Sequence, residues 1–207
     1  MRDYEEIRDF VEREIVPRYD AFDAGHGRDH VQTVISQALS LARYYPETDR
    51  CILLVAAAYH DLDLANGRDE HHIHSARIVR EDVRLRQWFS DDEINTIAEA
   101  AEDHRASSGH EPRTIYGRIV AEADRVIDSE IIVRRALQYG MKQYPELNSE
   151  EQYQRLMEHM MEKYAEGGYL KLWIPHGDNA RRLQKFRQTL SDEHAFRQLF
   201  ERIYDTL

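Results

Sequence analysis

Apolar side chains recur every three to four residues along nearly the whole chain, which is the pattern of amphipathic helices. The first such segment covers residues 3–19, and Pro17 disturbs its end. Its apolar face consists of Ile7, Phe10, Val11 and Ile15. Alternation of apolar and polar residues never extends far enough to predict a strand. The sequence therefore predicts an all-α protein.

Capping residues mark where the following helices begin. Asp29 is placed at one such start, and Thr48 or Asp49 at the next. Ser90 and Ser149 each precede a Glu or Gln by three residues, which is the capping-box pattern. The helices predicted in this way cover residues 29–45, 49–61, 70–87, 90–104, 115–127, a segment from 149, and 178–205. Polar loops are expected between them at 21–28, 63–68 and 106–112.

Composition narrows the class of protein. A chain of 207 residues, of which 42% are hydrophobic, is expected to form one domain over residues 1–207. Since no apolar stretch approaches the roughly 20 residues of a membrane span and no signal-peptide pattern begins the chain, we expect a cytoplasmic protein without a membrane partner. The single Cys51 leaves nitrogen and oxygen atoms as the ligands of any metal site.

The charge balance bears on possible partners. A formal net charge of −11 argues against binding to nucleic-acid backbones, which requires a basic surface. A small phosphorylated molecule remains compatible, because a metal ion and a few arginines can supply positive charge locally. Because the first lysine is Lys142, arginine is the only side chain with a permanent positive charge in the sequence before it. The amphipathic helices also permit a homodimer.

Candidate metal ligands interrupt the apolar pattern. His60-Asp61 closes the apolar run Cys51–Tyr59, where an imidazole and a carboxylate cost several kcal/mol unless a cation compensates them. Asp124 likewise lies on an apolar helical face. Adjacent residues point about 100° apart on a regular helix. His60 and Asp61 can therefore share a metal only where the helix frays, and the loop that follows them favours such an end.

The order His30, His60-Asp61, Asp124 resembles the H…HD…D signature of the HD-domain superfamily of metal-dependent phosphohydrolases. The segments that carry the likeness are His26-Gly-Arg-Asp-His30-Val-Gln-Thr-Val34, Ala57-Ala-Tyr-His-Asp-Leu62, and the helix that carries Asp124. The likeness covers about residues 20–130 and leaves 131–207 as a helical C-terminal extension. It implies an HD-domain helical bundle.

The resemblance implies that His30, His60, Asp61 and Asp124 bind one divalent cation. Mn, Fe, Mg, Co, Ni and Zn all accept such ligands, so the metal is left open.

In some branches of the superfamily a second ion is bridged by the HD aspartate and held by two further histidines. His104 matches one of these positions, and one of His71, His72 and His74 matches the other. Sequence does not rank the three firmly, although His71 is favoured because it precedes Ser75 by four residues. A solvated, polar helix start is the alternative explanation of this triplet.

The function implied by the resemblance is hydrolysis of a phosphate ester or phosphoanhydride, in a nucleotide or another phosphorylated metabolite, by metal-activated water. Asp61 is the candidate bridging or water-orienting ligand. Arg105 and Arg125 follow predicted ligands directly and are candidates to stabilise charge on the phosphoryl oxygens. His26 is a candidate leaving-group acid or a support for a ligand. The alternative is a regulatory module that binds metal or nucleotide without turnover.

The sequence departs from the signatures of three branches of the superfamily. The chain lacks the Glu-Asp pair that follows HD in the alarmone hydrolases of the superfamily and the glutamate that follows it in the nucleoside monophosphate phosphatases. The Gly-Tyr-Pro signature of the cyclic-dinucleotide phosphodiesterases is also missing. Arg28 and Arg113 lie in the bounding loops, where a surface ion pair with an acidic residue is the expected role.

Overall fold

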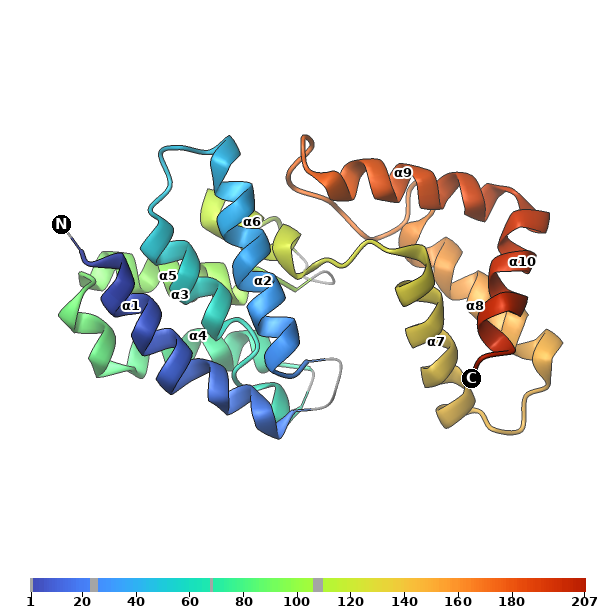
Figure 1. Ribbon diagram of the computed structural model, residues 1–207, viewed down its shortest axis with the longest axis horizontal. Coiled ribbons are helices and arrows are strands. Elements are labelled where there is room, and N and C mark those ends of the chain that lie inside the picture. Colours follow the sequence, from blue (N-terminus) through green and yellow to red (C-terminus); the bar gives the residue numbers. More distant parts are fainter. Residues whose placement is uncertain (1, 23–25, 68, 106–109) are drawn as a thin grey trace. The chain divides into compact units, whose positions relative to one another are not determined.

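The computed structural model describes residues 2–22, 26–67, 69–105 and 110–207. The chain divides into two compact units, Met1–Asp124 and Arg125–Leu207. Every regular element in the described ranges is helical, which confirms the all-α prediction (Figure 1). None of these helices is long and apolar enough to cross a membrane. Part of each predicted loop lies outside the described residues, namely 23–25, 68 and 106–109.

The first unit is a bundle of helices joined by short segments of tighter or wider helix (Figure 1). Its α-helices are α1 (Tyr4–Phe10), α2 (Arg28–Leu41), α3 (Arg50–Tyr59), α4 (His71–Glu81), α5 (Asp91–Glu102) and α6 (Ile115–Asp124).

Helix α3 is the centre of the first unit. Every residue from Cys51 to Tyr59 is buried, because α3 contacts α1, α2, α5 and α6. A helix surrounded in this way is apolar on all sides, which explains its uninterrupted apolar sequence. Asp49, one of the two predicted caps, accepts a hydrogen bond from the Cys51 amide at 2.7 Å. The predicted capping box of Ser90 and Glu93 also begins α5.

The N-terminal helix is shorter than predicted. After α1 the backbone widens into a π-helical turn at Val11–Ile15 and then tightens into a 3₁₀ segment at Val16–Ala21, with Pro17 near its start. Proline has no amide hydrogen to donate, so the regular α-helical ladder cannot pass through it.

Other helix ends in the first unit also differ from prediction. Gly27 is the N-cap of α2, whereas Asp29 lies inside its first turn, where its charge favours the helix dipole. The helix predicted over 70–87 ends at Glu81, since Asp82 is extended and begins a 3₁₀ segment, Val83–Gln87. Helix α6 ends at Asp124 rather than at Ile127.

The second unit contains α7 (Ser129–Gln143), α8 (Ser149–Tyr164), α9 (Asp178–Ser191) and α10 (Glu193–Tyr204). Helices α7 and α9 each pack on both α8 and α10. Within this unit the Tyr153 ring contacts the rings of Phe196 and Phe200, with centroids 5.9 and 5.2 Å away.

Two predictions for the second unit were wrong in detail. The capping box of α8 uses Asn148 and Glu151, one residue before the predicted pair, because Asn148 is the residue with extended backbone. The helix predicted over 178–205 is broken at Asp192, whose backbone is extended and whose side chain caps α10 by accepting from the Ala195 amide.

Candidate metal centre

The end of α3 brings His60 and Asp61 to the same site. The helix ends at Tyr59, and residues 60–63 form a turn. His60 and Asp61 are therefore not held at the 100° separation that a regular helix imposes on adjacent residues. His60 Nδ1 lies 2.8 Å from the Ala57 carbonyl oxygen. A carbonyl only accepts, so Nδ1 carries a proton and Nε2 is the nitrogen that faces the site. The predicted fraying at this position is confirmed.

His30 from α2 and Asp124 from the end of α6 face this turn. His30 Nε2 lies 3.3 Å from Asp124 Oδ1 and 3.7 Å from Asp61 Oδ2. His60 Nε2 lies 3.3 Å from Asp61 Oδ2 and 3.7 Å from Asp124 Oδ1. The four residues predicted to bind the first ion are thus brought together around one point.

Two more histidines approach the other oxygen of Asp61. His71 begins α4 and His104 follows α5, and each places its Nε2 3.2 Å from Asp61 Oδ1. The two Nε2 atoms are 3.3 Å apart. His104 Nδ1 is fixed by the Ala101 carbonyl at 2.6 Å, as His60 is by Ala57. The Asp61 carboxylate therefore stands between two pairs of imidazoles, one pair at each oxygen.

The structure distinguishes the three histidines at the start of α4. His71 is directed toward Asp61. His74 turns to Asp63, with its Nδ1 2.8 Å from a carboxylate oxygen. His72 lies beside His71, and burial together with the charge of Arg105 lowers its pKa to about 4. The geometry thus favours the residue that the sequence favoured.

Charges in the cluster stabilise one another. Burial lowers the pKa of His30, but the nearby carboxylates of Asp124 and Asp61 outweigh it and raise that pKa to about 9. Burial raises the pKa of Asp124, but His30 and the charge of His60 bring it down to about 2. The pKa of Asp61 is also lowered despite its burial, chiefly by the charge of His60. Both carboxylates are therefore ionised at neutral pH, as metal ligands must be, whereas His30 is protonated there and would release that proton to a metal ion.

The donor atoms fit a divalent cation. Nε2 of His30 and Nε2 of His60 are buried and make no hydrogen bond to the described residues, whereas buried polar atoms normally have a partner. Both nitrogens face carboxylate oxygens, and such a mixed set suits divalent metals. In the described residues, two sets of ligand atoms lie within 4.8 Å of one another: those of His30, His60 and Asp124, and those of His60, Asp61 and His104.

A hollow of about 220 Å³ opens onto this cluster. Besides four of the candidate ligands, it is lined by His26, Leu64 and Arg105. The His26 ring lies 5.7 Å from the His30 ring, and the Arg105 guanidinium donates to the Asp69 carbonyl. Two of the side chains predicted to act on substrate are therefore placed beside the ligands.

Three other arginines lie near predicted ligands or in the bounding loops. Arg28 pairs with Asp20 on the surface, and Arg113 pairs with Asp103, so the ion pairs expected for both are present. Arg125 is buried and is the first residue of the second unit. Its role at a phosphoryl group stays a prediction.

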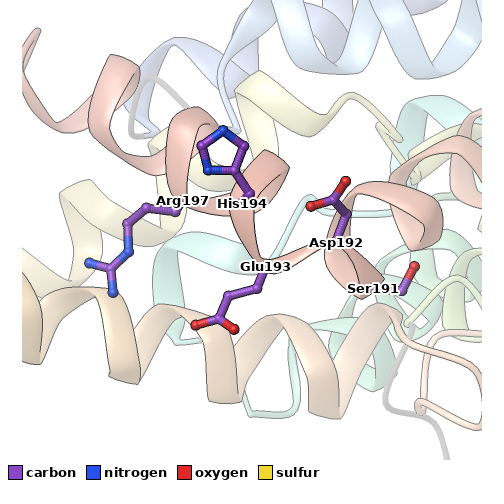
Figure 2. Close-up of a pocket in the computed structure, with 5 residues that line it drawn as sticks. All are labelled: Ser191, Asp192, Glu193, His194 and Arg197. Atoms are coloured by element: carbon purple, nitrogen blue, oxygen red, sulfur yellow. The ribbon is translucent and has the colours of Figure 1, made fainter.

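The second unit has a hollow of about 640 Å³ where α9 meets α10 (Figure 2). It is lined by Ser191, Asp192, Glu193, His194 and Arg197. Figure 2 shows the side chains of Glu193 and His194 pointing in different directions. Asp192 caps α10 and Arg197 pairs with Glu150. Two of the polar groups in this hollow, those of Asp192 and Arg197, are thus engaged in contacts with the helices themselves.

Sequence reasoning missed Asp63, which ties the turn after α3 to α4. Its amide donates to Ser75 Oγ at 3.2 Å, and its carboxylate accepts from Asn66 Nδ2 at 2.8 Å and contacts His74. Its position two residues after Asp61 was the available signal. Asp63 thereby fixes the start of α4, the helix that begins with His71.

Comparison with known proteins identifies the first unit. The family model of the HD domain matches residues 27–127, a range that contains all six candidate metal ligands. No curated protein and no solved structure matches the chain. HD domains are all-α and form a superfamily of metal-dependent hydrolases, in agreement with the helical bundle and its histidine–aspartate cluster. Residues 27–127 of the chain therefore carry an HD domain.

Proposed function

We propose that this protein is a metal-dependent phosphohydrolase that cleaves a phosphate ester or phosphoanhydride in a small phosphorylated metabolite, with nucleotides as the first candidates. The observation that carries the proposal is the position of Asp61. One of its oxygens faces His30 and His60, and the other faces His71 and His104. A carboxylate with ligand nitrogens at both oxygens is suited to bridge two cations.

The chain offers two groups of ligands that share Asp61. The first consists of His30, His60, Asp61 and Asp124, and the second of His71, His104 and Asp61. A divalent cation held by these residues would lower the pKa of bound water and polarise a phosphoryl oxygen. Ala57 and Ala101 fix the ring orientations of His60 and His104 through their carbonyls, so these donors are preorganised.

The walls of the hollow determine what approaches the cluster. Arg105 contributes a guanidinium that can donate to phosphoryl oxygens, whose negative charge grows during hydrolysis. His26 lines the same space and is the candidate to protonate the leaving oxygen. A hollow of about 220 Å³ admits a phosphoryl group and part of what it is attached to.

Hydrolysis of p-nitrophenyl phosphate, bis-p-nitrophenyl phosphate and a panel of nucleotides tests the proposal, with chelator-treated protein reloaded with each divalent metal in turn. We expect metal-dependent release of product by the wild type and none by Asp61→Ala. The matched control is Asp29→Ala, which removes the same charge from an exposed position in α2. We expect it to retain wild-type turnover.

A regulatory module would give a different result. It would bind metal or nucleotide and gain thermal stability from the bound ligand, yet release no product with any metal. Absence of metal binding in the wild type would contradict the metal-dependent hydrolase.

A further inference from the structure

Tyr19 is a buried side chain whose hydroxyl touches the turn that carries His60 and Asp61. It lies in the 3₁₀ segment Val16–Ala21, before the first residue matched by the HD family model, and is 0% exposed. Its hydroxyl donates to the Ala58 carbonyl at 2.9 Å and accepts from the Asp61 amide at 3.3 Å.

These two hydrogen bonds replace bonds that the helix loses as it ends. In a continuing helix the Asp61 amide would donate to the Ala57 carbonyl. Here that carbonyl is bound by His60 Nδ1, and the Ala58 carbonyl is among the last of α3, which have no partner within the helix. Buried backbone groups are costly when unpaired, so the turn requires an outside donor and acceptor. A hydroxyl supplies both from one atom.

We propose that Tyr19 is a positioning residue that holds the Asp61 backbone so that the carboxylate lies between the two pairs of histidines. This inference rests on the proposed metal-dependent function. Without the hydroxyl, the Asp61 amide would turn to the Ala57 carbonyl, its partner in a regular helix. It would then compete with His60 Nδ1, which is bound to that carbonyl. The two ligands of the turn then lose their common orientation.

The protonation of Tyr19 agrees with this role. Burial raises the pKa of its hydroxyl well above the usual value, and the negative charge of Asp61 adds to the effect. The phenol therefore stays neutral and keeps the proton that it donates to Ala58.

Tyr59 offers a matched control for a merely structural role. It is also 0% exposed, it lies on the last turn of α3, and its hydroxyl donates to Asp82 at 2.7 Å. Tyr59→Phe therefore also removes a buried, hydrogen-bonded hydroxyl, from a residue at the end of α3. Unlike the Tyr19 hydroxyl, this one does not bond the backbone of Asp61.

Titration of the metal-free protein with Mn²⁺, followed through the signal of the free ion, measures affinity without reference to activity. We expect Tyr19→Phe to weaken Mn²⁺ binding roughly 10- to 100-fold, the range found when groups that orient metal ligands are removed. Tyr59→Phe is expected to bind within about threefold of wild type. If Tyr19→Phe is unfolded at 25 °C, a stabilising osmolyte in all samples restores the comparison.

Wild-type affinity in folded Tyr19→Phe would overturn the inference. So would an equal loss in Tyr59→Phe, which would assign the effect to packing of α3. Failure of the wild type itself to bind Mn²⁺ or another divalent metal would instead refute the proposed function.

Discussion

At the scale of single residues, the cluster is organised by which oxygen of Asp61 each histidine faces. His30 and His60 face Oδ2, while His71 and His104 face Oδ1. Removal of a histidine therefore affects one half of the cluster more than the other, whereas removal of the carboxylate affects both. Metal content is the property in which this difference appears.

We expect elemental analysis to find two divalent ions per chain in the wild type, one in His71→Ala and none in Asp61→Ala. His71 supplies one imidazole of the Oδ1 half, and in His71→Ala the complete first group, His30, His60, Asp61 and Asp124, remains to hold the other ion. Asp61→Ala removes the ligand that both groups share. His72→Ala is the control, because His72 is the next residue on α4 and is not directed toward Asp61. Equal metal content in His71→Ala and wild type would contradict this division.

At the scale of helices and their ends, Asp82 joins α3 to the segment after α4. Its carboxylate accepts from the Tyr59 hydroxyl at 2.7 Å and from Arg84 Nε at 2.8 Å. Burial opposes ionisation of Asp82, but these donors, Arg84 first, lower its pKa below the usual value. The stabilisation from Asp82 is therefore present above the unfolded-state pKa of about 4 and is lost as the pH falls through the lower folded-state value.

Asp82→Asn is expected to reduce the free energy of unfolding at pH 7 by about 1–2 kcal/mol, since hydrogen bonds to a charged group are weakened. The difference from wild type shrinks as the pH falls below ~4, because the carboxyl of the unfolded wild type is then protonated, and it is lost below the lower folded-state pKa. Urea unfolding at pH 7 and at pH 3.5 measures both values. Glu81→Gln, at an exposed neighbouring position, is expected to change stability by less than about 0.5 kcal/mol. A constant difference across this pH range would contradict the assignment.

Two adjacent residues, Asn148 and Ser149, are candidates for the N-cap of α8, and the structure assigns this position to Asn148. Asn148 accepts from the Glu151 amide at 3.1 Å, and the Glu151 carboxylate accepts from the Asn148 amide at 2.8 Å. We expect Asn148→Ala to cost about 1 kcal/mol of stability and Ser149→Ala less than half of that. Thermal unfolding of both variants gives the comparison. A larger loss of stability in Ser149→Ala than in Asn148→Ala would instead support Ser149, the N-cap predicted from the sequence.

At the scale of the whole molecule, all six candidate ligands belong to the first unit, Met1–Asp124. A ligand that binds only the folded state at 100 times its dissociation constant stabilises that state by about 2.7 kcal/mol. We therefore expect saturating Mn²⁺ to slow amide hydrogen exchange at the end of α3 and at the starts of α2 and α4. Exchange in α8, α9 and α10 is expected to change little.

Hydrogen exchange followed by mass spectrometry resolves these segments. Asp61→Ala is the control and is expected to show no response to Mn²⁺. A response in α8–α10 as large as that in α3 would show that metal binding stabilises the two units together.

Prediction from sequence succeeded where the signal was local. The capping box of Ser90, the buried helix α3 and its frayed end at His60-Asp61 follow from the identities of a few adjacent residues. The predicted helix ends were wrong where a neighbouring residue fits the same capping pattern, as at Asn148. They were also wrong where one extended residue interrupts an amphipathic run, as at Asp82 and Asp192.

The sequence by itself determined the helical class, the central apolar helix and the residue types of the cluster, because apolar periodicity and the order of histidines and aspartates are properties of the chain. Only the tertiary structure decided which oxygen of Asp61 each histidine faces and which of the three histidines of α4 turns inward. It also revealed Tyr19, which meets Asp61 across 42 positions of sequence. The physical reason is that hydrogen bonds and ligand distances depend on atoms that packing brings together, and no local pattern encodes them.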